Sequence, residues 1–192
     1  AMVGYQQAFT DPSFRGQILT LTYPLIGNYG TNDEDYESSR CQIAGLVVKE
    51  MCEVPSNFRS TETLGGFLKR HGVVGISGVD TRGLTRKLRD VGVMMGAIST
   101  DERPQEALQR IKNSPAYGEV DLVPQVSTAS LYQWAPVGRP GGEARPRGGE
   151  EGLRIAVVDY GIRASILRNL WELGCQPIVM PCASTAEEVL AA

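Results

Sequence analysis

The chain has 192 residues, 42% of them hydrophobic, and its 19 basic and 22 acidic side chains give a formal net charge of −3. That balance excludes the broad basic surface with which many proteins bind nucleic acid. No apolar run approaches the roughly 18 residues of a membrane-spanning helix, and the N-terminal residues lack the basic and apolar segments of a signal peptide. Composition therefore predicts a soluble cytoplasmic protein with one large domain or two small ones, and no binding to nucleic acid or membranes.

The cysteines, the single histidine and the acidic residues form no recognisable site. No two of the four cysteines have the C-x-x-C spacing of zinc or redox sites, so we interpret them as buried thiols in a reducing compartment. His71 lies at the expected end of a helix, where a polar side chain suits the helix dipole. The acidic segment 33–37 can be a metal site or the solvated first turn of a helix. We favour the helix, because no second group of ligands accompanies it.

Strands and helices alternate along the first part of the chain. Three short segments have the apolar or alternating pattern of strands, at residues 17–23, 43–48 and 73–76. The first of them ends in a loop that contains Pro24 and Gly27. Thr61 can cap a helix that ends at Gly72, with an apolar face formed by Leu64, Phe67 and Leu68.

The strongest helix pattern of the chain covers residues 80–92. Asp80 or Thr81 can cap its N-terminus, and Gly92 can end it. Its apolar side chains recur at helical spacing and are expected to face the core: Leu84, Leu88 and Val91.

Two further elements follow this helix. Residues 93–99 have the pattern of a strand, and Pro104 opens another helix that carries apolar side chains at Ala107 and Ile111. The alternation of strands and helices predicts an α/β domain over residues 1–134.

A change in composition marks a linker at residues 135–152, which are mostly Pro, Gly and charged residues with nothing to face a core. Its glutamates offset its arginines, so a nucleic-acid-binding arm is not indicated.

The residues after the linker read as one strand–helix–strand unit. Its two strands are expected at residues 153–159 and 176–180, and the helix between them at residues 163–173. The start of a further helix is expected at residues 185–192. A lone unit of this kind cannot cover both faces of its own sheet. We therefore expect residues 153–192 to be the truncated start of a second domain and the natural protein to continue beyond Ala192.

Residue spacing alone points to no catalytic centre. The turn after the strand 153–159 has one glycine, Gly161, where a dinucleotide-binding fingerprint needs three, and neither a phosphate-binding loop nor a nucleophile elbow is present. The residues by themselves indicate an α/β module, with no catalytic residue and no metal ligand assigned.

Five motifs carry more specific information. They are T-D-P-S at residues 10–13, T-Y-P-L-I-G-N at 22–28, S-N-F-R at 56–59, V-D-T-R at 79–82 and V-D-Y-G at 158–161. In this order they closely resemble the small subunit of glutamine-dependent carbamoyl phosphate synthase. The resemblance spans nearly the whole chain except the linker, and it identifies the chain as a member of that family.

The resemblance implies a swivelling β/β/α N-terminal domain, followed by the first βαβ unit of a flavodoxin-like class I glutaminase domain. In this family a cysteine attacks the glutamine carboxamide, assisted by a histidine and a glutamate, and ammonia passes to a large subunit that uses ATP, Mg and bicarbonate. The implied assembly is a heterodimer that serves arginine and pyrimidine synthesis. The catalytic triad is expected beyond residue 192, and further strands before Gly4.

One residue of this chain is implied to contact the substrate. Ser13, the serine of T-D-P-S, matches the family position that contacts bound L-glutamine, although Asp-Pro-Ser also suits a tight turn of purely structural role. The arginines at positions 82, 86 and 89 lie on one helix face and can belong to the large-subunit surface or to a solvated face. For the whole chain, the alternative function is a non-enzymatic α/β interaction module.

Overall fold

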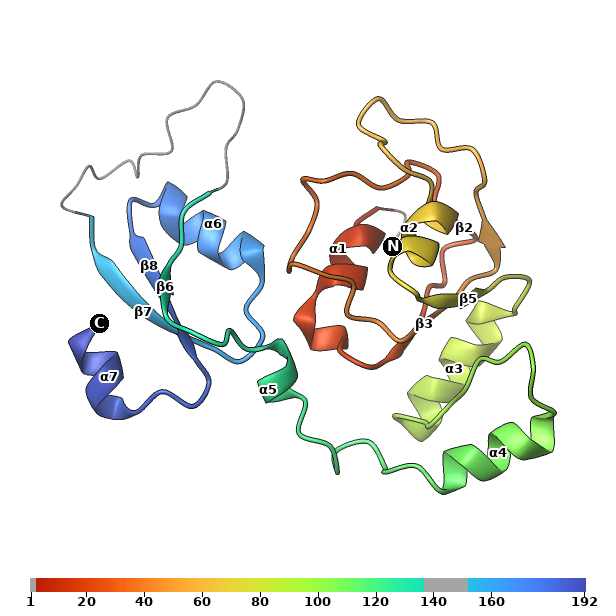
Figure 1. The fold of residues 1–192 in the computed structure, drawn as a ribbon. Coiled ribbons are helices and arrows are strands. Elements are labelled where there is room, and N and C mark those ends of the chain that lie inside the picture. The colour runs from red at the N-terminus through yellow and green to blue at the C-terminus, as the bar shows by residue number, and fades with distance from the viewer. Residues whose placement is uncertain (1–2, 137–151) are drawn as a thin grey trace. The chain divides into compact units, whose positions relative to one another are not determined.

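The computed structural model of the chain describes residues 3–136 and 152–192 (Figure 1). The chain divides into two compact units, Ala1–Asp121 and Leu122–Ala192. Both are mixed α/β units whose sheets contain parallel strands, which confirms the predicted α/β class. None of the helices in the described parts of the chain is both long and apolar enough to cross a bilayer.

The first unit is built on two small parallel sheets. The strands of the larger sheet, in the spatial order β1-β3-β5, are Ile18–Thr20, Gly45–Val47 and Val74–Ile76. Its register places Leu46 between Leu19 and Gly75. The smaller sheet pairs β2 (Leu25–Ile26) with β4 (Glu50–Met51). The helices of this unit are α1 (Tyr5–Thr10), the 3-10 turn η1 (Pro12–Phe14), α2 (Leu64–Arg70), α3 (Thr81–Val91) and α4 (Pro104–Lys112).

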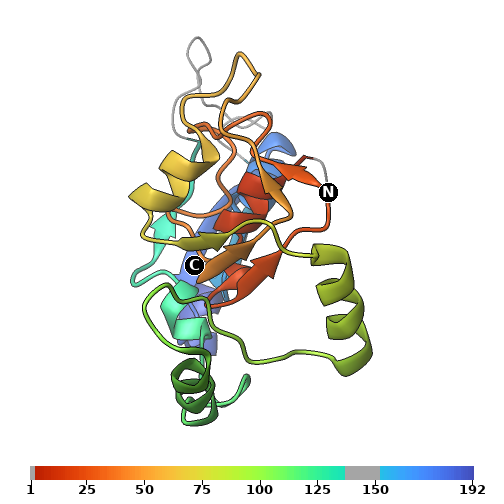
Figure 2. The same ribbon diagram turned by 90° about the vertical axis from the view of Figure 1, so that its right-hand side faces the viewer.

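The core of the first unit lies between α1, α2 and the central strand β3. Its fully buried large side chains come from these elements and from β2: Tyr5, Phe9, Ile26, Leu46, Leu64 and Phe67. By contrast, α3 lies at the periphery of the unit, as Figure 2 shows. Its range and its Asp80 cap confirm the predicted helix, with Asp80 Oδ1 accepting from the Gly83 N–H at 3.0 Å.

The expected apolar face of α3 is only partly buried. Leu84 and Leu88 are half-buried, and Val91 is 63% exposed. The expectation that all three face the core was therefore wrong for Val91. The only fully buried residue of the helix is Thr81.

The acidic segment 33–37 does not form the predicted helix. Asn32 Oδ1 accepts hydrogen bonds from the backbone N–H groups of Glu34 and Asp35, at 2.9 and 3.0 Å. A side-chain amide that binds the backbone in this way competes with helix formation. Arg59 then pairs with both carboxylates at 2.9 Å, which holds the segment as a loop.

Two other local predictions differ from the structure. Thr63, not Thr61, caps α2, with its Oγ1 accepting from the Gly66 N–H at 3.1 Å. Thr61 instead bonds the Thr31 carbonyl through its N–H and its hydroxyl. Residues 93–99 form no strand, because no neighbouring strand pairs with them.

The second unit contains the predicted strand–helix–strand arrangement. Strand β7 (Arg154–Asp159) pairs in parallel with β8 (Gln176–Pro181) over their full lengths, and α6 (Ala164–Glu172) connects them. The remaining elements of the unit are α5 (Val123–Val126), β6 (Tyr132–Gln133) and α7 (Ala186–Ala191).

Strand β6 was not anticipated. It pairs antiparallel with β8, with Tyr132 opposite Val179, and Trp134 continues this contact by donating its N–H to the Pro177 carbonyl at 2.9 Å. Residues 122–134 thus lie in the second unit, whereas the sequence assigned them to a domain over residues 1–134. Most of the predicted linker falls on residues 137–151, outside the described residues.

Candidate functional site

The T-D-P-S motif forms a tight turn directly after α1. Asp11 is buried, and its Oδ1 accepts from the Ser13 N–H at 2.9 Å. The carbonyl of Asp11 accepts from the Phe14 N–H, and that of Pro12 from the Arg15 N–H, both at 3.0 Å. The turn is therefore closed by the side chain of Asp11 and by backbone groups, and the hydroxyl of Ser13 has no part in closing it.

The side chain of Ser13 is exposed on this turn. Among the described residues its hydroxyl has no hydrogen-bond partner, while its carbonyl accepts from Gln17 Nε2 at 3.2 Å. A rigid turn that presents a hydroxyl to solvent can donate to a ligand without first breaking an internal bond. The structure thus leaves Ser13 available for the ligand contact that the family resemblance implies.

Buried polar contacts anchor α1, on which the turn depends. Since Gly4 offers no capping side chain, the Tyr29 hydroxyl accepts from the first backbone N–H groups, those of Gly4 at 2.6 Å and Tyr5 at 3.1 Å. The amide of Gln6 donates to the Asn32 carbonyl at 2.5 Å and accepts from the Asn32 N–H at 2.9 Å. These bonds fix the helix against the loop 29–38 and so fix the position of the turn.

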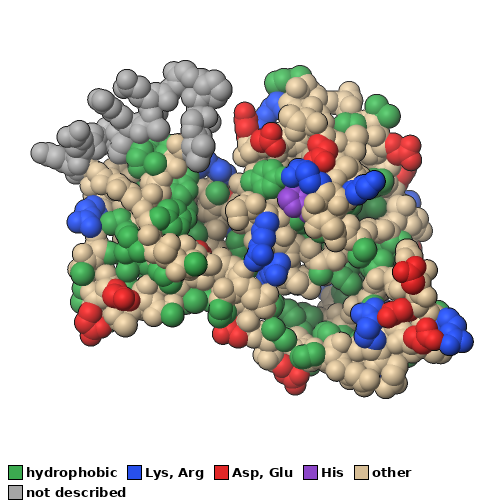
Figure 3. All heavy atoms as spheres, viewed as in Figure 1, with side chains coloured by type: hydrophobic (Ala, Val, Ile, Leu, Met, Phe, Trp, Pro, Cys, Tyr) green, Lys and Arg blue, Asp and Glu red, His purple; other side chains and the backbone are tan. Residues whose placement is uncertain are grey.

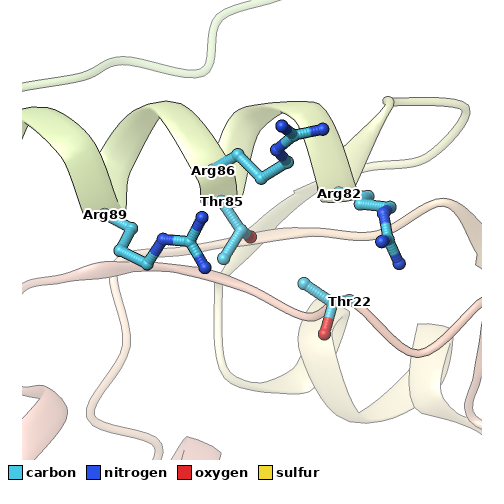
Figure 4. Close-up of a pocket in the computed structure, with 5 residues that line it drawn as sticks. All are labelled: Thr22, Arg82, Thr85, Arg86 and Arg89. Carbon is cyan, nitrogen blue, oxygen red and sulfur yellow. The ribbon is translucent and has the colours of Figure 1, made fainter.

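A second candidate site lies beside α3. A pocket of about 490 Å³ is lined by Thr22, Arg82, Thr85, Arg86 and Arg89. In Figure 4 the guanidinium of Arg89 reaches towards Thr85, and that of Arg82 extends beside Thr22. The structure thus brings together the three arginines that the sequence singled out, with two threonines that sequence reasoning missed. Thr22 begins the T-Y-P motif, which was the only signal that could have drawn attention to it.

The turn after β7 is the third motif-bearing segment. Asp159 is buried and accepts three backbone N–H groups: from Thr128 at 2.7 Å, Gly161 at 2.9 Å and Ile162 at 2.8 Å. These bonds hold the turn from β7 towards α6 and the segment before β6. Asp159 therefore acts as a structural anchor of the second unit.

In the described parts of the chain no three histidine, cysteine or carboxylate side chains are grouped as metal ligands.

Figure 3 shows acidic and basic side chains close together on the face drawn, including over α4. Ion pairs that join such side chains include Arg59 with Asp35, Arg70 with Glu62, and Arg110 with Glu102.

Comparison with known proteins gives one consistent result. Residues 1–98 match the family described as carbamoyl-phosphate synthase small chain, CPSase domain. Proteins named carbamoyl phosphate synthase small chain are similar over almost all of the chain: 42% identical in Nostoc sp. over 98% of it, 43% in Syntrophotalea carbinolica over 100%, and 46% in Fusobacterium nucleatum over 99%. The matches cover 50%, 51% and 49% of these relatives, so the chain spans about half their length. The chain belongs to the carbamoyl-phosphate synthase small chain family.

Proposed function

We propose that the full-length protein is the glutamine amidotransferase subunit of a carbamoyl phosphate synthase. In this proposal it hydrolyses L-glutamine and supplies ammonia to a large subunit, which forms carbamoyl phosphate from bicarbonate with ATP and Mg. The observation that carries it is the family match over residues 1–98, together with relatives of that name along almost the whole chain. We further propose a cytoplasmic heterodimer that serves arginine and pyrimidine synthesis.

The two units receive different roles in this proposal. The first unit is the swivelling β/β/α domain and presents Ser13 to the substrate. The second unit, with β7 and β8 parallel and α6 between them in sequence, is the start of a flavodoxin-like class I glutaminase domain, and this pairing supports the assignment. No residue of this chain is given a catalytic role.

Ser13 is proposed to bind glutamine through its hydroxyl. Support comes from the exposed position of the side chain and from the backbone bonds that hold the turn without it. A neutral hydrogen bond contributes about 0.5–1.5 kcal/mol net, and an unpaired buried ligand group costs about 1–3 kcal/mol. Loss of this hydroxyl should therefore weaken glutamine binding without unfolding the protein.

The direct test combines the purified full-length chain with its large subunit. We expect glutamine to drive carbamoyl phosphate synthesis only when both chains are present, and ammonium to drive it with the large subunit alone. Residues 1–192 expressed alone should release no ammonia from glutamine, because they encode no nucleophile elbow. A full-length chain that binds the large subunit without hydrolysing glutamine would instead identify a non-enzymatic interaction module.

A further inference from the structure

The arginines of α3 lack the close ion pairs that arginines near α4 make. Arg103, which directly precedes α4, pairs with Glu106 at 2.5 Å, and Arg110 on α4 pairs with Glu102 at 2.7 Å. Within the described residues, Arg82 and Arg86 have no ion-pair partner. Among these residues, Arg89 approaches only the carboxylate of the exposed Asp90, at 4.0 Å. Three positive charges thus lie along one helix face with almost no internal compensation.

These charges line one concave site, where the guanidinium groups of Arg82 and Arg89 reach towards the threonines and that of Arg86 points away from them. The pocket of about 490 Å³ is lined by the three arginines and two threonines, and no acidic side chain lines it (Figure 4). Every side-chain polar group in its lining is a hydrogen-bond donor or a hydroxyl. A site of that composition suits an oxyanion, because guanidinium groups bind phosphate and carboxylate oxygens through paired N–H donors.

Thr85 adds an independent observation. Its Oγ1 is buried and has no hydrogen-bond partner in the described structure, although the residue lines the pocket. A buried hydroxyl without a partner is costly, and native structures rarely leave one unsatisfied. A ligand oxygen in the pocket would supply the missing partner.

We infer that this pocket binds a phosphate-bearing small molecule, with Arg82 and Arg89 holding the phosphate oxygens, Arg86 adding to the positive charge of the site and Thr85 accepting or donating one hydrogen bond. The number of charges favours phosphate over a single carboxylate, since three guanidinium groups match a group that carries two or more negative charges. The site lies within the first unit and does not depend on the glutaminase proposal.

The test titrates inorganic phosphate and pyrophosphate into the full-length chain by calorimetry. We expect saturable binding that weakens as salt is raised, because the charges are exposed. The R82Q/R86Q variant should bind about 100-fold more weakly, which corresponds to about tenfold per arginine. The matched control R103Q/R110Q removes the same charge at α4 and at the residue before it, and it should bind like the wild type.

Thr85→Val separates binding from folding, because it keeps the branched shape and removes the hydroxyl. It should weaken pyrophosphate binding by about fivefold and leave the melting temperature equal or higher, since the hydroxyl has no partner without ligand. Absence of saturable binding by the wild type, or equal losses in the control, would overturn the inference. If R82Q/R86Q instead weakened only association with the large subunit, the site would be a protein contact and the inference would also fail. Glutaminase activity of the same variants reports separately on the proposed function.

Discussion

At the scale of single residues, neighbouring side chains in one motif have separate tasks. Asp11 closes the T-D-P-S turn and is buried, while Ser13 is exposed and contributes only backbone groups to the turn. The sequence predicted a turn at this place but left open whether the serine had a structural role. Which side chain accepts the capping hydrogen bond is decided by the fold, because both Asp and Ser are suited to it.

His71 gives a prediction about pH. Burial lowers the pKa of His71 below its usual range, and the charge of Arg70 lowers it further, against a smaller opposite effect of Glu62. Its ring packs on Phe67 with centroids 4.5 Å apart, and its Nε2 lies 3.3 Å from the Tyr36 hydroxyl. Since the folded state disfavours protonation, the stabilisation is present above the unfolded pKa of about 6.5 and is lost as pH falls below it.

The measurement is urea unfolding of the wild type and of His71→Gln at pH 7.5 and at pH 5.5. The wild type should lose more unfolding free energy on acidification than the variant, because carboxylate titration affects both proteins alike. Equal losses would show that His71 is not coupled to folding in this range.

At the scale of elements, the long and strongly patterned segments were predicted best. Helix α3 and the pair β7 and β8 follow clear periodic or apolar patterns. The failures have tertiary causes that no local pattern contains. The loop that replaces the helix at residues 33–37 is held by Arg59, which lies far along the chain. Strand β6 is two residues long and exists through its pairing with β8.

Close packing between loop segments gives the second stability prediction. Gly30 has a φ of +68°, and a Cβ there would lie 2.8 Å from the Glu62 carbonyl oxygen and would overlap the Ser60 hydroxyl. Gly72 has nearly the same φ, +65°, with nothing within 4 Å of that position. Gly72→Ala should therefore cost only the backbone strain, about 1–2 kcal/mol.

Gly30→Ala adds a clash with backbone to the same strain, so its loss should be at least about 3 kcal/mol. Thermal unfolding of the two variants compares them directly at matched backbone conformation. Similar melting temperatures would show that the segments around Gly30 and Glu62 separate without cost. The bridge between Thr31 and Glu62 would then be a weak part of the unit.

At the scale of the whole molecule, motif order revealed more than composition or periodicity. Residue patterns alone indicated an α/β module without a catalytic centre, and the ordered motifs indicated the family that residues 1–98 match. The pocket beside α3 was not predicted as a site. Its arginines were visible as a stripe, but Thr22 lies some sixty residues before Thr85 and only the fold brings them to one pocket.

The most direct test of the proposed role is the kinetics of Ser13→Ala in the full-length chain assembled with its large subunit. The Michaelis constant for glutamine should rise about 5- to 100-fold, on the scale where 1.4 kcal/mol is tenfold. Synthesis from free ammonia and the melting temperature should stay unchanged. As a contrast, Asp11→Ala removes the cap of the turn and should lower stability by about 0.5–2 kcal/mol. If Ser13→Ala lowered the ammonia-driven rate and the melting temperature together with the glutamine-driven rate, Ser13 would be a structural turn residue and its role in glutamine binding would be contradicted.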